Sequence, residues 1–206
     1  MIRTMRRSDE RLVAALHMKA ISGGFMAQLG QRFLAQLYRG IGQDENSVVW
    51  VSEIDGVFNG FCAYTSNVAG LYKRILRRRF LQLGCAALPQ ALRPSIIMEC
   101  LDTLRYPGKL SAIDLPAAEI LSIAVEDSAQ GTGTGKRLIG YALDRAQEDG
   151  ETHIKVLAGH KLEGANRFYK ACGFQKQLEL IQHGEPLNVF VFDLQGREPI
   201  KQGYGA

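Results

Sequence analysis

A glycine-rich loop in the second half of the sequence has the composition of an anion-binding site. Residues 128–141 read SAQGTGTGKRLIGY, in which three glycines alternate with two threonines ahead of Lys136 and Arg137. Small residues let a ligand approach the backbone closely, and the first amides of a helix have no partners inside the helix. Because these amides lie at the positive end of the helix dipole, they bind phosphate groups well. The stretch therefore predicts a phosphate or pyrophosphate ligand.

The spacing of the glycines excludes two common phosphate-binding loops. The dinucleotide fingerprint needs G-x-G-x-x-G, whereas Gly131, Gly133 and Gly135 give G-x-G-x-G. A P-loop needs G-x-x-x-x-G-K-[ST], and here the residue five before Gly135 is Gln130 and no Ser or Thr follows Lys136. A third pattern, Q/R-x-x-G-x-G/A between a strand and a helix, does fit. The alternative of a tight turn without ligand is disfavoured, because a simple turn does not need the entropic cost of three glycines.

Two consecutive motifs carry a family resemblance. ILSIAVEDSAQGTGTGKRLIGYAL resembles the acetyl-CoA-binding motif of the GNAT superfamily of N-acetyltransferases, and ANRFYKACGF downstream resembles the superfamily's next motif. Together they cover residues 119–174. The resemblance implies an α/β fold with a central mixed β-sheet of about seven strands (α+β mixed sheet) and flanking helices. It also implies an acetyl-CoA-dependent N-acetyltransferase that uses acetyl-CoA as co-substrate and needs no metal.

The resemblance assigns the donor site to two splayed strands, SIAV and HIKVL, with the pantetheine arm bound between them like a further strand. The backbone of Ser122, Ile123, Ala124 and Val125 would bind this arm. Asn166 would contact the pantetheine or the sulfur side of CoA, with an ordinary helix-surface amide as the alternative. The amides expected at the pyrophosphate are those of Gly131, Thr132, Gly133, Thr134, Gly135 and Lys136. Gln130, the first residue of the motif, is a further cofactor-binding candidate.

Two residues are candidates for proton transfer. By resemblance Tyr169, three residues after Asn166 on one helical face, would be a general acid that protonates the leaving thiolate; a packed aromatic is the alternative. Glu119 occupies the position of a general-base glutamate in histone-acetylating relatives. A partly desolvated carboxylate there could deprotonate the acceptor ammonium, and strand alternation would place Glu119, Leu121 and Ile123 on one face. The alternative is an exposed glutamate at a strand start.

The sequence offers no convincing nucleophile, disulfide or metal site. Its four histidines lack a matching Ser or Cys context, which favours direct transfer over an acyl-enzyme. No C-x-x-C pair occurs, and buried free thiols are the expectation for most of the cysteines, which are Cys62, Cys85, Cys100 and Cys172.

The elements around these motifs suggest one domain over residues 1–206, with a helical insertion at about 69–117 between the third and fourth strands and a flexible tail at about 196–206. A four-residue apolar step predicts a continuous helix over 25–41 despite Gly30. Asp55-Gly56 predicts a hairpin turn. Strands are expected at 2–5, 47–54, 57–66, 118–125, 152–159, 174–182 and 187–194, and further helices at about 9–21, 71–84, 94–106, 136–150 and 163–173.

Net charge and hydropathy do not identify a binding partner. The chain has 25 basic and 21 acidic residues, a net charge of +4 that does not by itself imply nucleic acid. Neither a signal peptide nor a membrane span is evident, so a cytoplasmic location is expected. The basic stretch 72–80 could meet an anionic acceptor or the CoA 3′-phosphate, or could only solubilise a helix; its arginines are Arg74, Arg77, Arg78 and Arg79.

The sequence thus predicts transfer of an acetyl group from acetyl-CoA directly to a primary amine of a small molecule, such as an anionic or nucleotide-linked amino sugar. Acetylation of a protein or peptide N-terminus or lysine is the main alternative. Two alternatives from other classes are a non-catalytic CoA-binding or anion-binding regulator, and a nucleic-acid or anionic-membrane binder that uses the insertion. Nucleic acid is not the expected partner, and a homodimer is left open.

Overall fold

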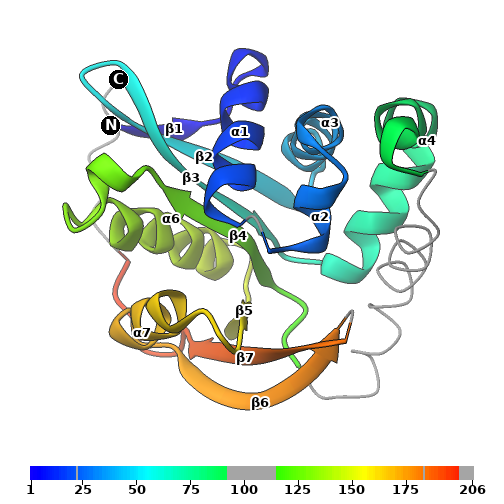
Figure 1. The fold of residues 1–206 in the computed structure, drawn as a ribbon. Coiled ribbons are helices and arrows are strands. Elements are labelled where there is room, and N and C mark those ends of the chain that lie inside the picture. Colours follow the sequence, from blue (N-terminus) through cyan, green and yellow to red (C-terminus); the bar gives the residue numbers. More distant parts are fainter. Residues whose placement is uncertain (22, 92–114, 183, 200–206) are drawn as a thin grey trace.

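A computed structural model describes residues 1–21, 23–91, 115–182 and 184–199 (Figure 1). Its centre is a seven-stranded sheet in the order β1-β2-β3-β4-β5-β7-β6, in which only β4 and β5 run parallel. The predicted mixed sheet of about seven strands is confirmed. The strands are β1 (Ile2–Thr4), β2 (Ser47–Ile54), β3 (Val57–Thr65), β4 (Glu119–Val125), β5 (His153–Gly159), β6 (Gln175–Gln182) and β7 (Glu185–Asp193).

Helices cover both faces of the sheet (Figure 1). One face carries α1 (Glu10–Ala20), α2 (Phe25–Gln28), α3 (Gln31–Gly42) and α4 (Val68–Ala91), and the other carries α6 (Thr134–Glu148) and α7 (Glu163–Ala171). Two short 3-10 helices, η1 (Arg7–Asp9) and η2 (Asp127–Ala129), precede α1 and α6. None of the helices in the described ranges is both long enough and apolar enough to span a bilayer.

The β2–β3 hairpin turns at the predicted dipeptide. Asp55 and Gly56 have φ values of 52° and 76°, the left-handed pair that a two-residue turn between twisted strands requires. The predicted continuous helix over 25–41 is wrong. Gly30 has φ 86° and ψ 165°, outside the helical region, and separates α2 from α3. The apolar pattern continues across the break because Leu29 and Leu34 are both buried.

A β-bulge interrupts β4 where it pairs with β3. The register passes from Ser122 to Ile120 while β3 advances by one residue. Ile123 consequently packs into the core under α6, whereas Leu121 packs against the core under α1 and α3. The expectation that Glu119, Leu121 and Ile123 share one face is wrong, because the extra residue breaks the alternation.

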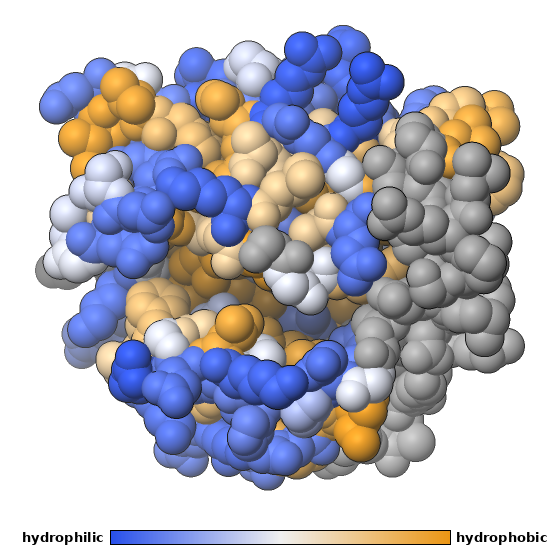
Figure 2. Space-filling model, in the orientation of Figure 1, coloured by the Kyte–Doolittle hydropathy of each residue, from blue (hydrophilic) through white to orange (hydrophobic). Residues whose placement is uncertain are grey.

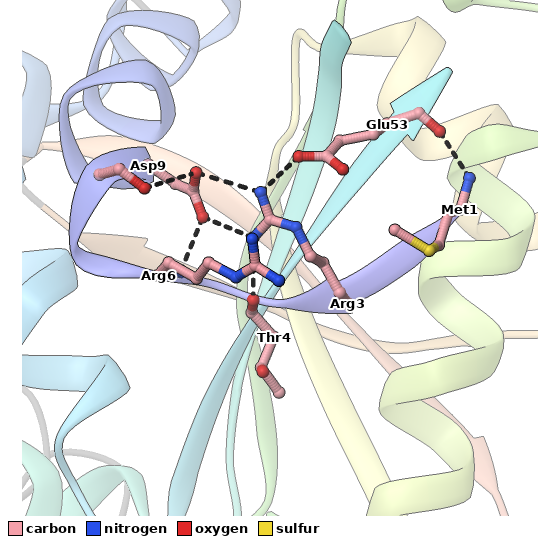
Figure 3. A network of polar contacts seen from close by, with 7 residues as sticks. Met1, Arg3, Thr4, Arg6, Asp9 and Glu53 are labelled. Atoms are coloured by element: carbon pink, nitrogen blue, oxygen red, sulfur yellow. Dashed lines mark hydrogen bonds and ion pairs between the residues drawn. The ribbon is translucent and has the colours of Figure 1, made fainter. Parts of the chain in front are cut away.

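A polar network fixes the start of the chain to the sheet and to α1 (Figure 3). The Arg3 guanidinium, in β1, lies 2.6 Å from the Asp9 carboxylate and also binds Glu53 in β2. Asp9 in turn accepts a hydrogen bond of 2.7 Å from the backbone amide of Arg6. Both oxygens of Asp9 are therefore engaged by groups on its N-terminal side.

The helical insertion is confirmed where the structure describes it. α4 follows β3 and carries one non-helical residue, Arg79, with φ −133° and ψ 19°. The helix expected over 94–106 lies outside the described residues, as do residues 200–206 of the expected flexible tail. The boundaries of the single domain and of the insertion stay predictions.

Candidate active site

A fork in the sheet forms the centre of the site. β4 and β5 are paired only at Glu119–Lys155 and Ile120–Val156, although β4 continues to Val125 and β5 to Gly159. Beyond Ile120 the β4 edge therefore has no strand partner on the β5 side. Unpaired backbone groups at such an edge can accept an extended ligand as a further strand.

The glycine-rich loop lies where β4 leads through η2 into α6. Gly133 is the N-cap of α6 and has φ 82°, a left-handed conformation that favours glycine. The Thr132 hydroxyl donates to the Ala129 carbonyl at 2.7 Å and lies 2.9 Å from the Thr134 hydroxyl. Both threonine side chains therefore shape the loop, and the first amides of a 15-residue helix are left for a ligand.

The acidic residues after β4 are neutralised from α1. Lys19 lies 2.7 Å from the Glu126 carboxylate and 2.9 Å from the Asp127 carboxylate. Because this lysine balances their charge, the two carboxylates repel a phosphate in the loop less than they would alone.

The open part of the fork and the loop line one cavity of about 580 Å³, the donor cavity. Figure 2 shows the apolar hollow on this face, with hydrophilic residues around it. α7 closes the cavity on the side opposite β4. Its lining is Ala20, Ile123, Ala124, Val125, Ala129, Gln130, Gly131, Gly133, Gly135, Lys136, Gly164, Ala165, Phe168 and Tyr169.

Apart from Asn166, the twelve predicted donor-site positions fall into two groups around this cavity. Its walls include nine of them, from Ile123–Val125, the loop and Tyr169. Thr132 and Thr134 do not line it, and Ser122 faces α3 instead, where its hydroxyl lies 2.8 Å from that of Tyr38. Their predicted contribution is through backbone groups, and it stays a prediction.

Asn166 is engaged by the protein itself. Its side-chain nitrogen donates to the carbonyls of Gly159, His160 and Leu162 at 2.8–3.2 Å, and its oxygen accepts from Asn188 at 2.8 Å. The side chain thus fixes the start of α7 against the end of β5. The predicted contact with the pantetheine stays a prediction, and this contact would have to compete with these four hydrogen bonds.

Replacing Gly135 with leucine is expected to abolish donor binding. A Cβ at this position would lie 3.1 Å from two ring carbons of Phe168, so a larger side chain must enter the donor cavity. Acetyl-CoA at one hundred times its Kd should stabilise the native protein by about 2.7 kcal/mol and the variant by almost nothing. Thermal melts with and without acetyl-CoA measure this. Gly84→Ala, with no atom within 4 Å of its Cβ, is the control; equal stabilisation of Gly135→Leu would contradict the assignment.

Tyr169 presents a protonated phenol to the donor cavity. The residue lines the cavity and packs against Phe174 and Phe190. No residue of the described ranges makes a hydrogen bond to its hydroxyl. Burial raises the pKa of Tyr169 well above its ordinary value, with smaller contributions from Cys62 and Cys172. The side chain is therefore a potential proton donor at neutral pH.

Glu119 is buried and paired, so the alternative of an exposed strand-start glutamate is wrong. Its Oε2 lies 3.3 Å from Lys155 Nζ, and Lys155 also donates to the Pro116 carbonyl. Oε2 has no well-directed hydrogen bond among the described residues. Burial raises the pKa of Glu119, and the Lys155 ammonium opposes that rise. The pair faces α4, where burial and the nearby Glu119 raise the pKa of Tyr72.

The structure also joins residues that the motifs did not single out. His17 in α1 and Tyr38 in α3 are buried, with His17 Nδ1 2.5 Å from the Tyr38 hydroxyl, which continues to Ser122 at the β4 bulge. Burial lowers the pKa of His17 to about 4, so the imidazole is neutral at pH 7.

The sequence contained one signal for Lys155, the partner of Glu119. A lysine inside the apolar run HIKVLAG needs a buried partner.

Replacing Tyr38 with phenylalanine should lower the free energy of unfolding by about 1–3 kcal/mol, because the buried His17 and the half-buried Ser122 each lose a hydrogen bond. Urea unfolding at pH 7 measures the change. Tyr141→Phe is the matched control, since no hydrogen bond to its hydroxyl occurs in the described ranges. Equal stability of the two variants would show that the His17–Tyr38–Ser122 chain is energetically neutral.

Comparisons with known proteins agree with this geometry. The family model for the acetyltransferase (GNAT) family matches residues 19–174. No curated protein matches the chain by sequence. Among solved structures, the yncA protein of Salmonella typhimurium, solved with its cofactor acetyl-CoA, superposes with a TM-score of 0.61 at 16% identity, covering 96% of this chain and 95% of that one.

Two further solved structures share the fold. An N-acetyltransferase from Staphylococcus aureus Mu50 has a TM-score of 0.60 at 16% identity, covering 95% of this chain and 98% of its own. A ribosomal-protein-alanine N-acetyltransferase from Brucella melitensis has a TM-score of 0.59 at 14% identity, covering 94% and 99%. The family match spans most of the chain and includes both motifs. The chain therefore belongs to the GNAT family of acetyltransferases, with acetyl-CoA as its acetyl donor.

Proposed function

We propose that this acetyltransferase moves the acetyl group directly to a primary amine of a small molecule. The observation that carries the proposal is the lining of the donor cavity. Its described residues include a protonated phenol, Tyr169, but no Ser, Thr, Cys or His that could carry an acyl group. Cys172 is the C-cap of α7, the helix that contains Tyr169. Burial raises the pKa of Cys172, which keeps it in the unreactive thiol form.

Acetyl-CoA supplies an acetyl thioester, and the protein supplies position and protons. The amides from Gly131 to Lys136 would hold the pyrophosphate, and the free edge of Ser122–Val125 would hold the pantetheine arm. Tyr169 would give its phenolic proton to the leaving thiolate. Holding both reactants in the fork would provide much of the rate enhancement through proximity.

Glu119 is the proposed base for the acceptor ammonium. It lies beside the last β4–β5 pair, on the face that carries α4, whereas Tyr169 packs on the face of α6 and α7. This arrangement supports entry of the amine from the α4 face and of the donor from the α6 side. A raised pKa makes the carboxylate a stronger base than an exposed one, and Lys155 preserves its charge.

An amino sugar, free or linked to a nucleotide, is the proposed acceptor class. Arg74 is bound to Asp44 and Arg79 to Gln36 and Gln43, which leaves the exposed Arg77 and Arg78 for an anionic acceptor. None of these arginines lines the donor cavity, so the structure offers no support for a contact with the CoA 3′-phosphate.

A competition assay tests the acceptor. Amino sugars, nucleotide-linked amino sugars, polyamines, amino acids and peptides are offered pairwise with acetyl-CoA, and kcat/KM is measured from released CoA thiol. The nucleotide-linked sugar should be preferred, and this preference should fall in Arg77→Gln/Arg78→Gln. Preference for a peptide would overturn the small-molecule acceptor, and an unchanged preference in the variant would overturn the role of the arginines.

A further inference from the structure

A second cavity, lined mainly by charged residues, lies between η1, the start of α1, the end of α3 and the kink of α4. We call it the arginine cavity. It has a volume of about 310 Å³ and shares no lining residue with the donor cavity. Its charged lining consists of Glu10 and four arginines, which are Arg6, Arg7, Arg39 and Arg79.

The carboxylates near the arginine cavity do not balance these cations. Glu10 is bound to Arg39, with Oε1 2.9 Å from Nε. Asp9, adjacent in sequence, is turned toward Arg3 and the backbone of Arg6 (Figure 3). Within the described ranges, the guanidinium groups of Arg6, Arg7 and Arg79 therefore form no ion pair with a carboxylate.

Arg79 is the least compensated of the four. Its guanidinium binds only two neutral amides, with NH1 3.2 Å from Gln36 Oε1 and NH2 on the oxygen of Gln43. Burial, together with the charges of Arg39 and Arg7, lowers its pKa, and Glu10 opposes this. Arg79 is also the residue at which α4 leaves helical geometry.

The C-terminal end of α3 compensates only part of the positive charge of these arginines. Gly42 and Gln43 at the cavity belong to that helix end, and its dipole is equivalent to about half a negative charge. With Glu10, the local negative charge is about 1.5 against four guanidinium groups, so an excess of about 2.5 positive charges is left. Guanidinium groups that line one cavity attract a phosphate, because each offers paired N–H donors to the phosphate oxygens.

We propose that the arginine cavity binds a phosphate group of a small-molecule ligand. The ligand class is a phosphate ester or pyrophosphate. The site lies at the opposite end of α1 from the donor cavity, since α1 begins at Glu10 in the arginine cavity and ends at Ala20 in the donor cavity. Eleven residues of helix span about 16 Å, so the two ligands would be held by one rigid element.

Equilibrium titration with inorganic pyrophosphate tests the site, with the donor loop filled by saturating CoA. We expect one pyrophosphate per chain in the native protein and binding at least about tenfold weaker in Arg79→Gln and in Arg7→Gln. The affinity of Arg79→Lys for pyrophosphate should lie between those of the native protein and Arg79→Gln, because lysine keeps the positive charge but lacks the paired N–H donors of a guanidinium group. Arg32→Gln, which removes an exposed arginine that lines neither cavity, should bind as the native protein does.

Any one of three titration results would overturn the proposal: no binding of pyrophosphate to the CoA-saturated protein, unchanged binding in both Arg79→Gln and Arg7→Gln, or equal weakening in Arg32→Gln. Binding of an oligonucleotide without any binding of pyrophosphate would also overturn it. If Arg79→Gln does not fold, Arg7→Gln decides, because Arg7 is exposed on η1. The same titration without CoA separates the two sites, since pyrophosphate bound at the donor loop would not respond to Arg79.

Discussion

Replacing Lys155 with methionine is expected to lower the free energy of unfolding by about 3–5 kcal/mol at pH 8. Lys155 and Glu119 are both buried, 3.3 Å apart. Loss of the ammonium leaves a buried carboxylate without its counter-charge, and that is the costly way to break a buried ion pair. Urea unfolding measures the change, and Lys73→Met, which removes an exposed lysine of α4, is the control.

The pH dependence of this loss distinguishes charge from packing. Burial already raises the pKa of Glu119, and the Lys155→Met variant lacks the ammonium group that opposes this rise. The folded variant then holds a proton that the unfolded chain, with an ordinary pKa of about 4.3, has released. Its stability therefore falls as pH rises above that value, by at most about 1.4 kcal/mol per pH unit. The deficit should be smaller at pH 5 than at pH 8.

The double variant Lys155→Met/Glu119→Gln completes a double-mutant cycle on this ion pair. It has neither charge, so it should recover part of the lost stability and should lose the extra pH dependence. A deficit in Lys155→Met that is the same at pH 5 and pH 8, or a double variant no more stable than the single one, would mean that the pair matters through packing alone.

Replacing Tyr169 with phenylalanine is expected to lower kcat about a hundredfold or more while leaving the Kd of acetyl-CoA nearly unchanged. The ring and its contacts with Phe174 and Phe190 are kept, and only the phenolic proton is lost. General acid catalysis by a positioned side chain contributes about 10²–10⁴-fold. Steady-state kinetics with the preferred amine, together with a titration of acetyl-CoA, separates the two effects.

The raised pKa of Tyr169 adds a second expectation for this variant. The phenol stays protonated above its ordinary pKa of about 10, so the native enzyme should show no loss of kcat below that pH from deprotonation of the acid. Tyr141→Phe should leave both kcat and the Kd as they are. Unchanged kcat in Tyr169→Phe, or equal losses of kcat and of acetyl-CoA affinity, would assign Tyr169 a structural role.

The donor loop could be predicted because its information is local. The spacing of Gln130, Gly133 and Gly135 after an apolar strand and before a helix depends on a short stretch of chain. The same holds for the hairpin at Asp55-Gly56, whose left-handed φ values follow from the residue types.

Other features depended on contacts between distant segments. The partner of Glu119 is set by the parallel register of β4 and β5, which no local pattern specifies, although the lysine in HIKVLAG signalled that a partner was needed. The bulge at Leu121 reversed the expected faces of β4 because one extra residue is invisible in an apolar run. At Gly30 the positive φ prevailed over a helical apolar pattern, since apolar spacing does not report backbone conformation.

Release of CoA thiol from acetyl-CoA tests the central claim most directly. The protein is incubated with acetyl-CoA, with and without the preferred amine of the panel, and thiol and acetylated amine are both quantified. Direct transfer predicts thiol release only when the amine is present, one thiol for each acetylated amine, and no acetylated protein in the mass spectrum. Binding of acetyl-CoA without thiol release for any amine would contradict this account and indicate a non-catalytic acetyl-CoA-binding protein.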